Sequence, residues 1–312
     1  MVIEIRGVTK KFGKLVAVDD MTLDVGAGEV FGFIGPNGAG KSTTMKILAC
    51  LLRPDSGSAK VNGHDVMTDG DAIRRVLGYM PDVLGVYDDL TVEEYLHFFA
   101  AAFNLPRKQR KATIEGVLEL TDLTEKKKAM VESLSRGMKQ RLGVARVLVH
   151  DPKVLLLDEP ASGLDPRARI EMRELLTELG RMGKCLIVSS HILTELAQMC
   201  SSIGIIERGR LLYAGSIDDA YRRMGVGDRV RIRLESEDAP LEALRKAIAD
   251  DERTQTAKVA DGAIHVELTP GQSSHHFLIE LLVAKGQRIA AFTPEAPRLE
   301  DAFMTLTKGQ VQ

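Results

Sequence analysis

The sequence has few cysteines, with three in 312 residues. Cys50, Cys185 and Cys200 lie far apart and form no C-x-x-C pair. This spacing argues against a disulfide framework and against a zinc site. It is typical of a protein kept in a reducing compartment such as the cytoplasm.

Long hydrophobic runs and an excess of basic charge are also missing. No apolar stretch approaches the roughly 20 residues that span a bilayer, and no signal peptide opens the chain. Lysine and arginine total 42 and aspartate and glutamate 44, so the formal net charge is −2. No overall basic field draws the protein to nucleic acid or acidic lipid, and we expect no nucleic-acid partner. If the protein works at a membrane, we expect another chain to supply the crossing.

The chain is long enough for a full α/β domain of about 200 residues and a smaller one. Residues 3–6 alternate between apolar and polar side chains as a strand does. Residues 28–35 predict a short apolar strand that enters a glycine turn. Near-continuous apolar runs at 153–157 and 185–190 are typical of parallel strands buried on both faces. Residues 92–149 have a mostly helical period. Together these patterns predict an α/β domain over residues 1–220.

A break at residues 221–228 separates this domain from a second pattern, and we predict a linker there. Strands and helices are expected in the order β-α-β-β-α-β, which is the split βαβ or ferredoxin-like pattern. The expected strands are 230–234, 256–259, 264–268 and 288–292, and the helices are 241–249, 277–284 and 299–306. We therefore predict a small α+β accessory domain over residues 229–312, without a catalytic motif.

The segment GPNGAGKS fits the phosphate-binding motif G-x-x-x-x-G-K-[ST], with a predicted strand before it and an amphipathic helix after it. Backbone N–H groups of such a loop cradle phosphates. Lys41 would bridge the β and γ phosphates, and the Ser42 hydroxyl would bind Mg²⁺. The alternative is a plain glycine-rich turn with a surface lysine. The predicted nucleotide-binding residues of this segment are Gly35, Pro36, Asn37, Gly38, Ala39, Gly40, Lys41, Ser42 and Thr43.

Polar residues follow two of the buried strands. Asp158 and Glu159 end the run KVLLL, which places two acids at the carboxyl edge of a sheet, where α/β proteins bind ligands. Asp158 suits the Mg²⁺ shell and Glu159 suits the attacking water. The alternative is that both acids start a solvated loop. His191 ends the run CLIVSS and should lie at the same edge, either as a functional residue or as a hydrogen-bonded structural one.

A second anion site is expected at ESLSRGMKQRL, where Ser135 is a favoured N-cap for the helix that follows. The free N–H groups at a helix N-terminus bind anions.

The five ordered motifs at residues 35–42, 134–138, 158–159, 162–165 and 191 resemble the Walker A, signature, Walker B, D-loop and switch-histidine motifs of the ATP-binding cassette family. The resemblance covers residues 1–220. It implies a P-loop NTPase cassette with an antiparallel β subdomain and a helical subdomain, and it makes Glu159, His191 and Lys41 the catalytic residues.

The resemblance also implies that two copies of the chain bind head to tail. Ser135 and Gly137 would then contact the γ phosphate held by the opposite subunit. Phe12 resembles the aromatic residue that stacks on adenine in this family, although a phenylalanine beside a strand could equally be a core residue.

Two departures from the family pattern stand out. The usual signature is L-S-G-G-Q, whereas this chain has L-S-R-G-M, so Arg136 adds a positive charge and Met138 removes a side-chain amide. Asp82 occupies the position that a glutamine normally fills. Because a carboxylate can ligate Mg²⁺ as an amide oxygen does, we expect Asp82 to point at the metal or to stay withdrawn until it binds.

The segment at 85–105 and the C-terminal extension resemble the drug-export-like branch of the family. This resemblance predicts an ATP-hydrolysing subunit that uses ATP and Mg²⁺, works at the cytoplasmic face of the cell membrane and powers a separate membrane-spanning permease. The alternative is a soluble cassette ATPase of DNA repair or translation. Repair members need a long coiled-coil insertion before the signature, and translation members usually carry two cassettes in one chain, whereas this chain has neither feature. A P-loop kinase would leave the signature and D-loop unexplained.

Overall fold

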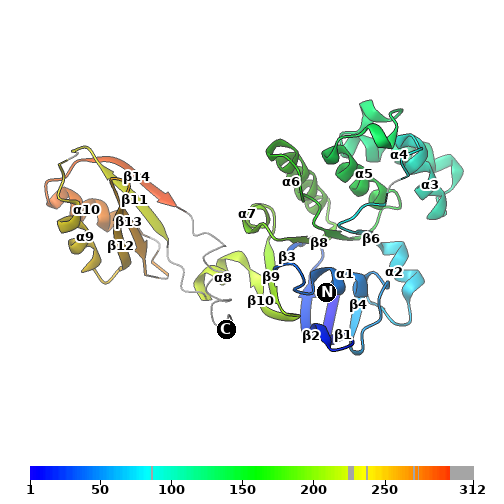
Figure 1. Cartoon of the computed structure of the whole chain (residues 1–312), viewed down its shortest axis with the longest axis horizontal. Coiled ribbons are helices and arrows are strands. Elements are labelled where there is room, and N and C mark those ends of the chain that lie inside the picture. The colour runs from blue at the N-terminus through cyan, green and yellow to red at the C-terminus, as the bar shows by residue number, and fades with distance from the viewer. Residues whose placement is uncertain (86, 224–227, 237, 270, 273, 296–312) are drawn as a thin grey trace. The chain divides into compact units, whose positions relative to one another are not determined.

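The computed structural model describes residues 1–85, 87–223, 228–236, 238–269, 271–272 and 274–295. The chain divides into two compact units, Met1–Gly215 and Ser216–Gln312 (Figure 1). The helix predicted at 299–306 lies outside the described residues. Within the described part of the chain, no helix combines the length and hydrophobicity needed to cross a membrane.

The first unit begins with a four-stranded antiparallel sheet of order β2-β1-β4-β5. Ile3 and Ile5 are buried, as the alternating pattern predicts. Its strands are β1 (Ile3–Phe12), β2 (Leu15–Val25), β4 (Ser56–Val61) and β5 (His64–Asp65). This sheet is the antiparallel β subdomain that the family resemblance implies.

A six-stranded sheet of order β10-β9-β3-β8-β7-β6 forms the centre of the first unit. Its neighbours from β9 to β6 pair in parallel. Every residue of β3, β7 and β8 is buried, which confirms the prediction from the apolar runs. The strands are β3 (Val30–Ile34), β6 (Leu77–Met80), β7 (Val154–Asp158), β8 (Cys185–Ser190), β9 (Ser202–Glu207) and β10 (Arg210–Ser216).

The carboxyl ends of the three central strands meet at one edge of this sheet. Ile34 is in register with Ser190, and Asp158 is in register with Ser189. The loops after β3, β7 and β8 therefore begin side by side. The helices associated with this sheet are α1 (Lys41–Leu48), α2 (Gly70–Val76), α6 (Pro166–Arg181) and α7 (Leu193–Ala197).

The predicted helical region forms a separate subdomain (Figure 1). It contains α3 (Val92–Ala102), α4 (Arg107–Leu120) and α5 (Arg136–Leu148), with two short 3-10 turns between the last two. Thr91 and Glu94 form a capping box at the start of α3. Tyr95, which is fully buried, packs its ring against that of Phe99 at 4.9 Å.

The second unit has a four-stranded sheet of order β12-β13-β11-β14, with every pair antiparallel. This is the arrangement predicted from the β-α-β-β-α-β order. Helix α8 continues to Arg223, so the first three residues of the segment predicted as a linker are helical. The elements are α8 (Ile217–Arg223), β11 (Arg229–Leu234), α9 (Leu241–Ala249), β12 (Thr254–Ala260), β13 (Ala263–Leu268), α10 (His276–Ala284) and β14 (Ile289–Glu295).

Helices α9 and α10 lie on one side of this sheet (Figure 1). Leu244 and Ile248 of α9 and Leu278 of α10 join the core that also contains Val230 and Ile232 of β11. The helices therefore cover the face of the sheet to which the even-numbered residues of β11 point.

Candidate functional site

The loop between β3 and α1 needs glycine for two reasons. Gly38 and Gly40 have φ angles of 80° and 111°, in a region that side chains other than glycine rarely adopt. A Cβ at Gly40 would also clash with the carbonyl oxygen of Ala17. Within the described chain, α1 has no side-chain cap, so its first N–H groups stay available to an anion.

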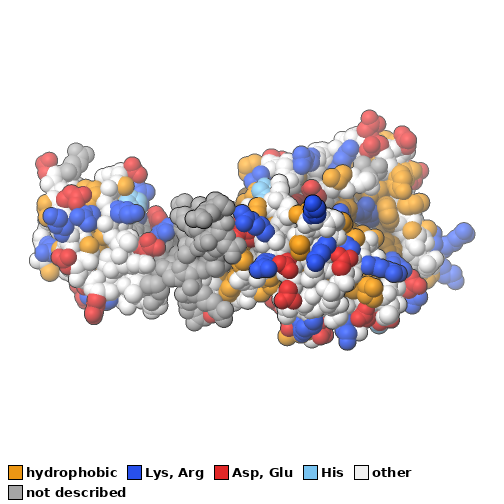
Figure 2. Space-filling view, turned by 60° about the horizontal axis from the view of Figure 1, so that its bottom comes forward, with side chains coloured by type: hydrophobic (Ala, Val, Ile, Leu, Met, Phe, Trp, Pro, Cys, Tyr) orange, Lys and Arg blue, Asp and Glu red, His pale blue; other side chains and the backbone are white. Residues whose placement is uncertain are grey.

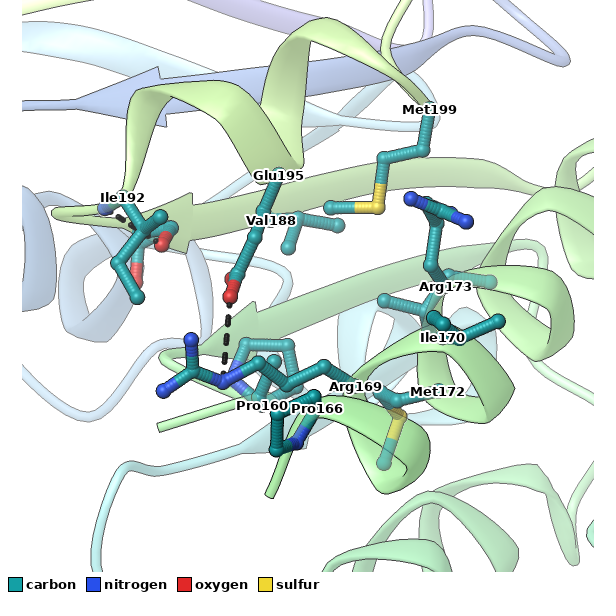
Figure 3. A pocket seen from close by; sticks show the side chains of 14 residues that line it. Pro160, Pro166, Arg169, Ile170, Met172, Arg173, Val188, Ile192, Glu195 and Met199 are labelled. Atoms are coloured by element: carbon teal, nitrogen blue, oxygen red, sulfur yellow. Dashed lines mark hydrogen bonds and ion pairs between the residues drawn. The ribbon is translucent and has the colours of Figure 1, made fainter. Parts of the chain in front are cut away.

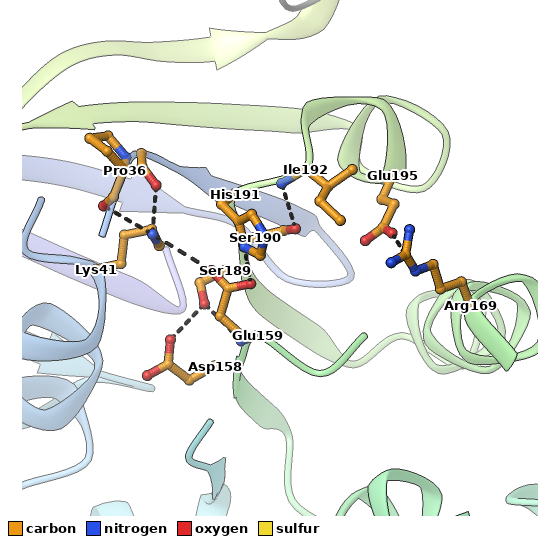
Figure 4. A network of polar contacts seen from close by, with 11 residues as sticks. Pro36, Lys41, Asp158, Glu159, Arg169, Ser189, Ser190, His191, Ile192 and Glu195 are labelled. Carbon is orange, nitrogen blue, oxygen red and sulfur yellow. Dashed lines mark hydrogen bonds and ion pairs between the residues drawn. The ribbon is translucent and has the colours of Figure 1, made fainter. Parts of the chain in front are cut away.

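Lys41, the first residue of α1, is 5% exposed. Its ammonium donates hydrogen bonds to the carbonyl oxygens of Gly35 at 2.6 Å and Pro36 at 3.3 Å. It also lies 3.6 Å from Oε1 of Glu159, with which it forms an ion pair (Figure 4). The lysine of the phosphate loop and the acid after β7 are thus joined, as their predicted shared edge requires.

Ser189, which the motif analysis missed, connects the two acids. Its hydroxyl donates to Oδ1 of Asp158 at 2.6 Å and accepts from the backbone N–H of Glu159 at 2.9 Å (Figure 4). Glu159 has a φ of 51°, an uncommon backbone conformation for a residue with a side chain, and this hydrogen bond helps to hold it. The signal in the sequence was a pair of serines that ends an otherwise apolar buried strand.

His191 completes the group of predicted catalytic residues. Its Nδ1 lies 2.8 Å from Oε2 of Glu159. Because a carboxylate only accepts, Nδ1 carries the proton and Nε2 is left for another partner. Ser190 accepts a hydrogen bond from the backbone N–H of Ile192 at 3.0 Å, which stabilises the turn that follows the histidine. Lys41, Glu159 and His191, from three different loops, therefore form one connected network.

The charges of two carboxylates act on the phenol of Tyr79 on β6. Burial, with smaller contributions from the charges of Asp158 and Asp82, raises the pKa of the Tyr79 phenol to about 12. Its hydroxyl is buried and has no hydrogen-bond partner among the described residues. Asp82 therefore belongs to the same electrostatic environment as Asp158, although 76 residues of sequence separate them.

A cavity of about 250 Å³ brings together Phe12 and the predicted nucleotide residues Pro36–Thr43, whereas Gly35 does not line it. Phe12 is 48% exposed and lines this cavity, so the alternative that it is a core residue is wrong. Neither Ser135 nor Gly137 is among the lining residues. Those lining residues are Phe12, Leu15, Ala17, Pro36–Thr43, Asp82 and Glu159.

Ser135 caps α5, as predicted, and its hydroxyl accepts a hydrogen bond from the N–H of Met138 at 3.3 Å. The guanidinium of Arg136 lies against Gly163 of the D-loop, in the space that a Cβ at this glycine would need. Gly137 lies beside Ala168, at the start of α6. The unusual arginine of the signature therefore packs within its own chain, on the loop that follows Glu159.

A second cavity, of about 280 Å³, lies beside the loops that carry Glu159 and His191. Arg169 of α6 and Glu195 of α7 reach toward each other across it and form an ion pair at 3.5 Å (Figure 3). Burial raises the pKa of Glu195, and the charge of Arg169 opposes this shift. The ion pair connects the helix after the D-loop with the helix after His191.

Comparisons with known proteins agree with this geometry. A family model described as ABC transporter matches residues 18–162, a range that contains the phosphate loop, Ser135 and both acids. The chain is 36% identical over 319 residues to the probable multidrug ABC transporter ATP-binding protein YbhF of Escherichia coli (strain K12), covering 99% of this chain and 52% of that protein. The chain thus spans about half the length of this relative. It is 35% identical over 309 residues to the bacitracin transport ATP-binding protein BcrA of Bacillus licheniformis, covering 99% of this chain and 98% of that protein.

Solved structures give the same fold for the first unit. An ATP-binding subunit of an ABC transporter is 30% identical and has a TM-score of 0.65, covering 72% of this chain and 93% of that one. The cassette MJ0796, solved as a dimer, is 24% identical with a TM-score of 0.63, covering 69% of this chain and 98% of that one, and it supports the fold alone.

Proposed function

The chain belongs to the ABC transporter family, and from that premise we propose that it is the ATP-binding and ATP-hydrolysing subunit of an exporter whose membrane-spanning part is a separate chain. The observation that carries this proposal is the Lys41–Glu159–His191 network at the end of the central sheet. In this scheme residues 1–220 are the motor and residues 229–312 are an accessory domain.

Each residue of the network would have its own role in ATP hydrolysis. The Glu159 carboxylate orients and polarises the attacking water, and Lys41 and the N–H groups of the loop stabilise charge on the phosphates. His191, held by Glu159 through Nδ1, has Nε2 available for the γ phosphate. Ser189 keeps Asp158 and Glu159 in fixed relative positions, which matters because phosphoryl transfer depends mainly on positioning and charge. Phe12, exposed beside the loop, suits adenine stacking.

Mg²⁺ fits the oxygen donors near the loop. Among the described residues, no group of three or more His, Cys, Asp or Glu side chains could hold a metal by itself. This suits Mg²⁺, which proteins hold through one or two carboxylates while phosphates and waters complete its shell. Ser42, Asp158 and Asp82 would hold the ion, which would supply charge neutralisation at the phosphates.

A second copy of the chain would supply the signature loop. The cavity at the phosphate loop has no lining residue from positions 134–138, while Ser135 at the start of α5 is exposed. An exposed helix N-terminus of this kind suits the γ phosphate bound by the other copy. Head-to-tail pairing thus gives Ser135 and Gly137 their role and makes hydrolysis depend on dimerisation.

The helical subdomain offers a surface for the membrane partner. Val83, Tyr87 and Phe98 are 80%, 52% and 48% exposed, and the rings of Tyr87 and Phe98 meet edge to face at 5.3 Å. Figure 2 shows hydrophobic side chains gathered at the end of this unit that holds the helical subdomain. Exposed apolar groups of this kind mark interaction sites. Binding there would hold the subunit at the cytoplasmic face of the membrane, and the relatives named for multidrug and bacitracin transport favour export over a soluble ATPase role.

The test is Glu159→Gln in the purified chain. We expect ATP hydrolysis to fall roughly 100- to 10,000-fold, because the general base is lost, while ATP binding remains. We also expect ATP to hold this variant as a dimer, measured by light scattering after size-exclusion chromatography. Glu174→Gln makes the same change on an exposed part of α6 and should hydrolyse ATP as the unaltered chain does. Normal turnover by Glu159→Gln would contradict the role of Glu159, and the absence of an ATP-dependent dimer would contradict the shared site.

A further inference from the structure

Among the residues that the structure describes, no helix covers one face of the sheet of the second unit. On β11, Val230, Ile232 and Leu234 are buried on the face that α9 and α10 cover. The alternating residues Arg231 and Arg233 are exposed on the opposite face. We propose that this open face binds a phosphate group through Arg231 and Arg233. This inference goes beyond the proposed function, because the nucleotide site lies in the other unit.

The strand register gathers basic residues on the open face. Lys258 is opposite His265, His265 is opposite Arg231, and Arg231 is opposite Thr293, which makes one row across all four strands. Side chains in such a row point to the same face. On this face Glu267 and Glu295 are both opposite Arg229, which lies two residues before Arg231 at the start of β11. The end of the face with Arg231 and Arg233 is therefore basic.

The two arginines lack partners of their own. Among the residues that the structure describes, neither Arg231 nor Arg233 makes an ion pair or a hydrogen bond, and Nε2 of His265 is buried without a hydrogen-bond partner. Other arginines of this unit are neutralised by a carboxylate. These are Arg229 with Glu267, Arg245 with Glu242, Arg253 with Asp251 and Arg288 with Glu235. Two like charges left unpaired on one strand favour an anion.

The cavity beside the two arginines indicates which class of ligand the site would bind. A cavity of about 200 Å³ is lined by Arg231, Arg233, Ala291 and Thr293. Its lining offers two guanidinium groups and a hydroxyl but no aromatic ring on which a base could stack, so it suits a single phosphate group better than a nucleotide. Guanidinium groups bind phosphate oxygens with paired hydrogen bonds, the small Ala291 leaves room, and the Thr293 hydroxyl can donate another.

Single-stranded nucleic acid is a poor fit for the same face. Such ligands are bound by stacking their bases on aromatic side chains. The described positions of this face on β11, β12, β13 and β14 carry no Phe, Tyr or Trp. The phosphate could belong to the headgroup of an anionic lipid or to a soluble phosphate monoester.

The experiment measures the binding of two probes to the unaltered full chain and to the double variant Arg231→Gln/Arg233→Gln. One probe is vesicles of phosphatidylcholine with phosphatidylglycerol, with pure phosphatidylcholine vesicles as the neutral reference. The other probe is glycerol phosphate, whose binding is measured by isothermal titration calorimetry. Arg245→Gln/Lys246→Gln removes the same two charges from α9, on the covered side of the sheet, and is the matched control. Thermal unfolding of each variant checks that it is folded.

We expect the unaltered chain to bind one of the probes and the Arg231/Arg233 variant to bind it roughly tenfold more weakly or worse, because hydrogen bonds between charged groups are strong. The α9 control should bind as the unaltered chain does. Binding to anionic vesicles alone identifies a lipid headgroup, and binding to glycerol phosphate identifies a soluble ligand. Absence of binding to either probe, or equal loss in the α9 control, would overturn the proposal. ATP hydrolysis is not part of the readout, so failure here leaves the nucleotide site untouched.

Discussion

The two sheets differ in where they can present polar groups. In the six-stranded sheet, β3, β7 and β8 are buried along their whole length, so only the strand ends can carry chemistry. In the four-stranded sheet, buried and exposed residues alternate along β11, so within the described part of the chain one face is exposed. A parallel sheet covered on both sides concentrates its polar groups at one edge, whereas an antiparallel sheet covered on one side spreads them over a surface.

This difference is the basis for the different ligands that we propose for the two units. At the edge of the first sheet, Lys41 and Asp158 are buried and Glu159 is half-buried, and ion pairs and hydrogen bonds connect them, which suits the proposed catalysis by positioning. On the open face of the second sheet, the arginines are exposed and without partners among the described residues, as reversible binding of an anion requires.

The largest expected effect is the loss of stability when a side chain is added at Gly40, in the loop between β3 and α1. Gly40→Ala should destabilise the first unit by roughly 2–5 kcal/mol, because a left-handed φ and a clash with the Ala17 carbonyl act together. Gly262→Ala in the second unit changes a glycine with a φ of 67° and open space around it, so it should cost only about 1–2 kcal/mol. Urea unfolding followed by circular dichroism measures both variants. Equal losses would show that the loop is no more crowded than a surface turn.

Ser189→Ala should lower the rate constant of ATP hydrolysis roughly 10- to 100-fold, because it removes a hydrogen bond to the carboxylate of Asp158 and frees the backbone of Glu159. The KM for ATP should change less, since Ser189 does not line the nucleotide cavity.

Two control variants accompany this prediction. Ser190→Ala, at the adjacent position, removes a hydrogen bond to the backbone of Ile192 and should have a smaller effect on hydrolysis. Thr293→Ala, on the open face, should leave hydrolysis unchanged. A Ser189→Ala enzyme with normal turnover would mean that the bridge between the acids is dispensable.

A smaller effect is expected from half-buried His150 in the first unit. Burial lowers its pKa, and its ring stacks on Phe103 with centroids 3.8 Å apart. The unfolded chain therefore takes up a proton at higher pH than the folded chain does, so stability is lost as pH falls from about 6.5 toward the lower pKa of the folded protein. His150→Gln should make the unfolding free energy of the first unit less dependent on pH between 7 and 5. His276→Gln removes an exposed histidine of the second unit and is the control. An unchanged slope in His150→Gln would argue against burial of the neutral ring.

The smallest expected effect is the reaction of the cysteines with iodoacetamide. It measures the accessibility of the first unit alone, because all three cysteines lie there. Burial raises the pKa of Cys185 and of Cys200 to about 12, so neither should react with iodoacetamide at pH 8 in the folded protein. Cys50 is half-buried, and burial also raises its pKa, so it should react slowly. Mass spectrometry of the native protein checks the order, and Cys50→Ser should remove the slow labelling. Reaction of Cys185 at the same rate as Cys50 would contradict its burial.

Much of the fold follows from local patterns in the chain. The apolar runs before Asp158 and His191 predict buried parallel strands, and the structure confirms them. The β-α-β-β-α-β order expected for the second unit is the order of its elements from β11 to β14. These predictions work because side-chain periodicity and turn residues act over a few positions. Ser189 and Tyr79 were missed because their roles come from neighbours on other strands.

The sequence by itself determined the phosphate loop, the acids Asp158 and Glu159 at the end of a buried strand, and the capped start of α5, because each depends on residues close together along the chain. Only the tertiary structure decided that Ser189 joins the two acids, that Arg136 lies against Gly163, and that Arg231 and Arg233 share an exposed face on which no described residue pairs with them. The physical reason is that these arrangements depend on strand register and loop packing between segments distant in sequence, which no local spacing specifies.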